Sequence, residues 1–269
     1  MKNFFAAGLI LVSIFGVAGC NISFQRWQFR TANKMAANKE HKMAVDLYSR
    51  VMKRAPTQPL AIEAARMGAR LASYEVKDYA KAVEFYSHIV LYSPDPSERL
   101  TAQKSLTEIQ FEKLMNYDQA LIELNHLIPL LPPKERAPYQ LQVAHSYFNL
   151  NNSSQALIEV DELLSKRISS DLRFEALVFK GNLLQAAKRL DEAIKVFTGL
   201  RKDFESRAAA ENIGMSLAIC YEEKSDLKSA IEVLEDMKKH HANPDFIQIR
   251  IARLKERLAN LPGAQGFKR

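Results

Sequence analysis

Turn-forming residues are scarce in this sequence. It has nine glycines and ten prolines in 269 residues, and three of the glycines lie within the first 19 residues, at Gly8, Gly16 and Gly19. Tight turns and phosphate-binding loops depend on glycine, so this scarcity disfavours an all-β fold and an α/β enzyme built on glycine loops. Only two cysteines are present, which excludes a disulfide-stapled scaffold.

Residue patterns that carry chemistry are also missing. The six histidines are dispersed, and no His or Cys spacing suits zinc; no phosphate loop, nucleophile elbow or kinase signature occurs. Cys220 lies in the apolar run 217–221, where a lone cysteine is typical of a small buried hydrophobic residue. We therefore expect no enzymatic activity, no cofactor and no metal.

The N-terminus has the composition of an export signal. Lys2 is followed by an apolar run that ends at Phe15, and small residues precede Cys20. Because this run is short for a membrane-spanning helix, it predicts a signal peptide over residues 1–19.

Val17-Ala18-Gly19-Cys20 resembles the lipobox of bacterial lipoproteins. The resemblance implies that Cys20 carries fatty-acyl chains such as palmitate and becomes the first residue after cleavage. Two or more chains hold a protein firmly to a bilayer. Asn21, by the same resemblance, favours the outer membrane with the body facing the periplasm. An ordinary signal peptide with an incidental cysteine, or an uncleaved anchor, is the alternative.

A short phrase recurs along the rest of the chain: an alanine followed four residues later by a large apolar residue. Its copies begin at intervals of 36 to 38 residues, and they are Ala44…Tyr48, Ala82…Tyr86, Ala120…Leu124, Ala156…Val160, Ala193…Phe197 and Ala230…Leu234. Each phrase opens an apolar stripe with helical spacing, and a second apolar helix precedes it. The sequence therefore predicts six pairs of helices.

Small residues also recur twelve positions before the alanine in four of the pairs, at Ala32, Ala144, Gly181 and Ala218. Small residues at both positions let two antiparallel helices approach closely. The corresponding residues in the second and third pairs are Arg70 and Glu108, so we expect those first helices to be shifted in register or their loops to be longer.

This pattern resembles the helix-turn-helix unit of tetratricopeptide (TPR) repeats. The resemblance implies an all-α fold, a right-handed α-solenoid of about six TPR-like repeats over residues 20–260. Pro244 opens a last helix that we expect to cap the solenoid. We expect residues 261–269 to form a mobile tail.

In TPR proteins the first helix of each repeat lines a concave groove that binds peptides. Carried over to this sequence where the register is clear, the groove residues are Phe29, Asn33, Leu141, His145, Phe148, Val178, Asn182, Gln185, Met215, Ile219 and Glu222. The alternative for about half of them is packing within or between repeats. The Lys and Asn clamp of chaperone-binding TPR domains does not occur, because Phe29 and Val178 stand where the lysine would be.

Positive charge is concentrated near the termini. Residues 20–54 contain eight basic and two acidic residues, whereas residues 55–243 have a net negative charge. A nucleic-acid role is therefore not expected. Arg26, Trp27, Arg30 and Lys34 follow the proposed anchor, and basic and tryptophan side chains there suit a membrane surface. The alternative is that they form the solvated face and core of the first repeat.

The layout as a whole resembles two groups of bacterial TPR lipoproteins: the TPR lipoprotein of the β-barrel assembly machinery and the pilotins of type IV pili. This resemblance implies a periplasmic protein-protein interaction scaffold that binds other envelope proteins during outer-membrane protein or secretin assembly. An adaptor that recruits peptidoglycan-cleaving enzymes is the second interpretation, and an enzyme the third.

Overall fold

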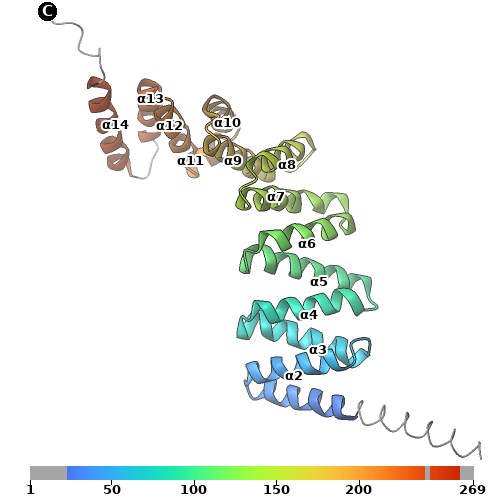
Figure 1. Cartoon of the computed structure of the whole chain (residues 1–269). Helices are drawn as coiled ribbons and strands as arrows, with labels where there is room; N and C mark the ends of the chain where they lie inside the picture. The colour runs from blue at the N-terminus through green and yellow to red at the C-terminus, as the bar shows by residue number, and fades with distance from the viewer. Residues whose placement is uncertain (1–22, 240–242, 261–269) are drawn as a thin grey trace, which may run out of the picture. The chain divides into compact units, whose positions relative to one another are not determined.

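The computed structural model describes residues 23–239 and 243–260. The predicted signal peptide, Cys20 and the predicted tail over 261–269 lie outside the described residues. Every regular element in the described ranges is a helix, and the helices follow one another as antiparallel pairs (Figure 1). They group into two compact units, which meet in the sequence between Leu131 and Pro132.

The first unit contains three pairs. Residues 23–37 are helical and precede the labelled elements. The others, in chain order, are α2 (His41–Arg54), α3 (Pro59–Arg70) with the π-helical turn η1 (Leu71–Val76), α4 (Tyr79–Tyr92), α5 (Pro96–Glu108) with the π-helical turn η2 (Ile109–Lys113), and α6 (Tyr117–Leu130).

The second unit contains three more pairs and a final helix. Its helices are α7 (Pro133–Asn149), α8 (Ser153–Ser165), α9 (Ser170–Ala186), α10 (Leu190–Asp203), the short α11 (Glu205–Ala210), α12 (Ile213–Glu223), α13 (Leu227–Lys238) and α14 (Pro244–Ala259). The predicted cap is α14, which buries Ile247, Ile251 and Leu254 against α13.

The recurrent alanines lie where the two helices of a pair meet. All six are fully buried, as are the small residues twelve positions before four of them. At Gly181 an added Cβ would lie 2.5 Å from the ring of Phe197, so this ring packs directly on the α9 backbone in the space that a side chain would need. The close crossing of the paired helices explains why only small residues stand at these positions.

The second and third pairs reach the same crossing by a different route. Arg70 and Glu108, which stand twelve residues before the alanine, do not occupy the crossing; Ala69 and Thr107, one residue earlier, are buried instead. The extra residue is taken up in η1 and η2, because a π-helical turn holds one more residue than an α-helical turn. The predicted register shift is therefore confirmed, with a cause in the helix itself rather than in a longer loop.

One residue of the recurrent phrase was predicted incorrectly. In the second pair Tyr86 is only half-buried, and the fully buried aromatic side chain is Phe85, three residues after Ala82. The ring of Phe85 lies against Gly68, where an added Cβ would be 2.4 Å away.

All six pairs share one turn. A residue in the left-handed region, with φ between 50° and 65°, stands five positions before each recurrent alanine; the residues are Lys39, Lys77, Met115, Asn151, Lys188 and Ser225. In every pair except the second, the backbone N–H of the next residue donates back to a carbonyl near the end of the first helix, as Asp226 does to Tyr221 at 2.9 Å. This closure satisfies carbonyls that the helix end leaves free.

Candidate functional site

The first helices of the pairs form a continuous surface in each unit, and we call it the A-face of that unit. In the first unit the A-face contains two adjacent pockets of about 640 Å³ and 300 Å³. Tyr74, whose side chain is 70% exposed, lines both of them. The two pockets are therefore neighbours, and residues of α2 and α4 line them together with the first helices of the three pairs; we call the two pockets together the A-face groove.

Polar donors converge in the larger pocket. Asn33 accepts a hydrogen bond at its Oδ1 from the buried hydroxyl of Tyr48 at 2.6 Å, and its amide N–H groups have no hydrogen-bond partner among the described residues. Burial raises the pKa of Tyr48, and the nearby guanidinium of Arg70 partly offsets this increase, while Glu63 adds to it. The Nδ1 atom of His41 is buried without a hydrogen-bond partner in the described part of the chain.

The smaller pocket is richer in aromatic side chains. Tyr74, Tyr79 and Tyr86 line it together with the charged residues Lys77, Glu108 and Lys113. The hydroxyl oxygen of Ser73, in the same wall, is buried and has no partner among the described residues. Aromatic rings beside charged side chains suit a polypeptide, which offers both apolar side chains and polar backbone groups.

The π-helical turns shape this groove. Tyr74 lies in η1, and Ile109 and Lys113 of the smaller pocket lie in η2. A residue inserted in a helix rotates every following side chain around the helix axis, so η1 and η2 decide which residues face the groove. The sequence predicted a register shift or longer loops in the second and third pairs and left their groove residues unassigned, so Arg70, Tyr74 and Glu108 were not among the predicted groove residues.

The predicted groove residues of the first unit have different positions. Asn33 is exposed and lines the larger pocket. Phe29 is only 8% exposed, and its ring packs against Tyr48 with a centroid distance of 5.8 Å. Phe29 lines neither pocket and is part of the core cluster of the first unit, so Phe29 is corrected to a core residue.

In the second unit, α7 and α9 bring three rings together. His145 lies against Phe179 with a centroid distance of 3.8 Å, and Phe148 meets the same ring edge-on at 6.0 Å. Burial lowers the pKa of His145, an effect that the carboxylate of Glu175 partly opposes. Leu141 is only 7% exposed and, like Phe29, is corrected to a core residue.

The remaining predicted groove residues stay accessible to different degrees. Asn182 is exposed, and half-buried positions hold Val178, Gln185, Met215, Ile219 and Glu222. Glu222 is engaged within the protein, because Arg250 donates to it at 2.7 Å and Arg257 lies 3.6 Å away. Gln185 donates to Glu223 at 3.3 Å. These contacts tie α9 to α12 and α12 to α14, so part of the predicted groove is a structural seam.

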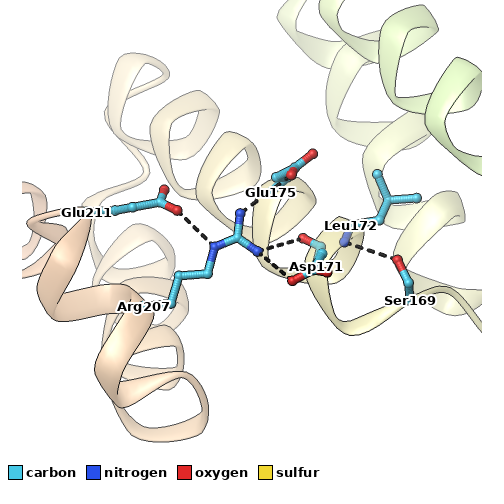
Figure 2. A network of polar contacts seen from close by, with 6 residues as sticks. All are labelled: Ser169, Asp171, Leu172, Glu175, Arg207 and Glu211. Carbon is cyan, nitrogen blue, oxygen red and sulfur yellow. Dashed lines mark hydrogen bonds and ion pairs between the residues drawn. The ribbon is translucent and has the colours of Figure 1, made fainter.

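A polar network fixes the short helix α11 beside α9. Figure 2 shows the guanidinium of Arg207 between Asp171, Glu175 and Glu211, at distances of 3.1, 3.4 and 2.8 Å. The same group stands 4.2 Å from the centre of the Phe174 ring. Every acceptor around Arg207 comes from this chain, so we assign the network a structural role.

The described residues hold no cluster of three or more His, Cys, Asp or Glu side chains suited to a metal ion. Within the same ranges, none of the helices has the length and apolar character needed to cross a bilayer. Cys220 is buried, and burial raises the pKa of its thiol to about 11, with a further contribution from Glu223. A thiol with so high a pKa is a poor nucleophile at neutral pH.

No protein-family model matches the sequence, and no curated protein matches it. Solved structures do resemble its fold. YrrB, described as a TPR protein with an unusual peptide-binding site, is 16% identical and has a TM-score of 0.50; the match covers 77% of this chain and 97% of YrrB. The MamA protein is 12% identical with a TM-score of 0.52, and the match covers 74% of this chain and 94% of MamA.

A third similar structure is that of Naa15/Naa10 bound to HypK-THB, which is 13% identical with a TM-score of 0.56. That match covers 90% of this chain and 42% of the other. At such low identity the similarity concerns the fold. The protein is therefore an all-α solenoid of TPR-like helix pairs, the architecture typical of non-catalytic interaction scaffolds.

Proposed function

We propose that this protein is a lipid-anchored scaffold of the bacterial cell envelope that binds polypeptide segments of other envelope proteins through its A-face groove. The observation that carries the proposal is the groove itself. Two pockets share Tyr74 and place polar and basic side chains, among them Asn33, Arg70 and Lys77, beside aromatic rings across three successive helix pairs. An elongated site of this chemistry fits an extended or helical peptide.

The envelope location is supported by the sequence. The apolar run and the Val17-Ala18-Gly19-Cys20 motif match a lipoprotein signal, and acyl chains on Cys20 would hold the body at a membrane surface. Asn21 supports the outer membrane. The partners we propose are components of outer-membrane protein assembly or of secretin and pilus assembly. Recruitment of peptidoglycan-cleaving enzymes is the alternative that the experiment below separates.

A photo-crosslinking amino acid placed at position 74 in living cells tests the groove. We expect it to capture a specific polypeptide, which mass spectrometry would identify as a barrel or secretin component, or as a soluble hydrolase in the alternative. Leu91 is the matched control, because it is 71% exposed but lies on α4, the second helix of its pair.

A second variant links the capture to the groove chemistry. Arg70→Glu reverses a charge in the larger pocket and should abolish capture at position 74, whereas Arg50→Glu changes an exposed arginine of α2 outside the groove and should leave it intact. Equal capture at positions 74 and 91, or equal effects of the two reversals, would refute the proposed site.

The anchor requires its own test. The mature protein should carry a mass increment corresponding to acyl chains, and Cys20→Ala should remove this increment and release the protein from membranes. An unchanged mass together with retained membrane attachment would contradict the lipid anchor without affecting the groove.

A further inference from the structure

Two aromatic side chains at the start of the described chain are exposed to solvent. Phe24 is 42% exposed and Trp27 is 57% exposed, and their rings stack with a centroid distance of 5.5 Å and an interplanar angle of 30°. The guanidinium of Arg54, at the end of α2, stands 4.4 Å from the centre of the Phe24 ring. The first helix pair therefore presents an aromatic and cationic cluster to its surroundings.

Three further basic residues share this side of the helix. Arg26, Arg30 and Lys34 are exposed, and no carboxylate lies within ion-pair distance of them in the parts of the chain that the structure describes. At 3.6 residues per turn, these residues and the two aromatic residues fall within an arc of about 160°. We call this surface the basic-aromatic face; it consists of Phe24, Arg26, Trp27, Arg30 and Lys34.

The opposite side of the same helix packs on its neighbours. Gln25, Gln28, Phe29 and Ala32 are buried, and the amide of Gln25 donates to the carbonyl of Val51 at 2.9 Å. The helix is thus fixed in orientation by the core of the first unit, and the basic-aromatic face is held outward. The alternative interpretation of Trp27 as a core residue is excluded by its exposure.

The charge on this face is not balanced locally. The helix over residues 23–37 contains three basic residues, Arg26, Arg30 and Lys34, and no acidic residue. The arginines of α14 are in a different environment, because Arg250 and Arg257 both contact the carboxylate of Glu222. A basic surface with no carboxylate partner among the described residues fits an anionic one.

We infer that the basic-aromatic face docks on the anionic headgroups of a bilayer. Exposed tryptophan and phenylalanine beside arginine and lysine match the interfacial layer, where aromatic rings enter the headgroup region and basic side chains meet phosphates. Phe24 follows Cys20 by four residues, a reach of at most about 14 Å, so acyl chains on Cys20 would bring this face to the same surface. The inference uses the proposed anchor for its geometry, but its test does not depend on the anchor.

The chain offers a built-in probe, since Trp27 is its only tryptophan. The full protein, extracted from its membrane, is mixed with vesicles of phosphatidylcholine alone or of phosphatidylcholine with phosphatidylglycerol. With the anionic vesicles we expect the Trp27 emission to shift to shorter wavelength and to be quenched by lipids brominated on their acyl chains. With the neutral vesicles both effects should be much smaller, even where acyl chains hold the protein to them.

Charge reversal identifies the surface responsible. The triple variant Arg26→Glu, Arg30→Glu and Lys34→Glu should weaken lipid binding. The anionic-lipid concentration that gives half of the maximal Trp27 response should rise by about two orders of magnitude. Its matched control reverses three exposed basic residues of the second unit, Lys195, Lys228 and Arg253, and so changes the net charge equally. This control should keep the response because the basic-aromatic face is unchanged. Circular dichroism verifies that both variants retain their helices.

Two results would overturn the inference. One is a Trp27 emission that is the same with neutral and anionic vesicles; the other is an equal loss in the control variant, which would indicate a diffuse charge effect. A protein that lacks acyl chains by mass but still shows the anionic-lipid response would refute the anchor alone. An acylated protein without that response would refute the docking face alone.

Discussion

The phenyl ring of Phe197 occupies the space that a side chain at Gly181 would need. An added Cβ would stand 2.5 Å from Cε1 and 2.6 Å from Cζ of that ring, well inside contact distance. Gly199 lies in the next helix, α10, and a Cβ added there would have no neighbouring atom from outside its own helix backbone within 4 Å. The chain thus contains two helical glycines in opposite environments, and they separate packing from helix propensity.

Gly181→Ala should lower the free energy of unfolding by about 1 to 2 kcal/mol, because the strain of overpacking exceeds the gain in helix propensity. Gly199→Ala should raise it by about 0.5 to 1 kcal/mol through propensity alone. Urea unfolding followed by circular dichroism measures both. The two changes in the free energy of unfolding should have opposite signs. A stabilising Gly181→Ala would show that the helices can separate at no cost.

The left-handed turn residues allow a second test. Met115 has a φ of 50° and is 64% exposed, so it bears the steric cost of this conformation without compensating contacts. That cost is about 1 to 2 kcal/mol for a residue with a Cβ. Met115→Gly should therefore stabilise the protein by up to about 1 kcal/mol, after the larger backbone entropy of glycine in the unfolded chain is subtracted.

Ala252→Gly is the control for this substitution, because Ala252 is exposed in the interior of α14. There, glycine should destabilise by about 1 kcal/mol. If both substitutions destabilise equally in thermal or urea unfolding, the left-handed geometry of Met115 would be contradicted.

A third prediction concerns pH. Arg66 of α3 donates two hydrogen bonds to Glu98 of α5, which lowers the pKa of Glu98 below its ordinary 4.5; burial opposes the shift and the Ser93 hydroxyl assists it. The ionised form is therefore favoured by folding. The stabilisation is complete above pH 4.5 and is lost as the pH falls through the lower, folded-state pKa.

Glu98→Gln should consequently destabilise the protein at neutral pH, and its difference from the unmodified protein should narrow in acid. Urea unfolding at a series of pH values between neutral and acid measures this. Glu232→Gln, at an exposed position of α13, is the matched control. A difference for Glu98→Gln that stays constant across the series would show that the Arg66 pair does not contribute.

The fourth prediction counts thiols. With a pKa of about 11 and a buried side chain, Cys220 should resist maleimide in the native protein at neutral pH and react once the protein is unfolded. An acylated Cys20 has no thiol, so the native lipoprotein should incorporate no label and the unfolded one a single label. Labelling of Cys220 in the native state would indicate that α12 opens readily.

The helix pairs could be predicted because their signal repeats. The alanines at intervals of 36 to 38 residues mark a backbone contact that tolerates nothing larger, and six occurrences of one constraint identify the fold without any single strong motif. Ala193 and Phe197, for example, lie at the crossing that the phrase predicts. The sequence also predicts the capping helix, because one apolar stripe on a last helix is what is needed to cover the apolar face of the last pair.

The groove was harder to predict, because the rotation of each helix about its axis decides which of its side chains face the groove. Arg70 and Glu108 predict a register shift or a longer loop in their pairs, but the sequence does not distinguish the two, so it does not assign the side chains that face the groove. Phe29 and Leu141 stand at formal groove positions, yet large apolar side chains there can turn toward the core. The signal available in the sequence was a tyrosine near the end of a first helix, Tyr74.

The π-helical turns η1 and η2 have one further consequence. Each lies between the buried crossing of its pair and the turn that leads into the second helix, so its extra residue changes the outward side chains while Ala69 and Thr107 keep their places. Gain or loss of a single residue at these points would therefore exchange the side chains that line the two pockets without changing the interior. The first unit of this solenoid can diversify by length as well as by substitution.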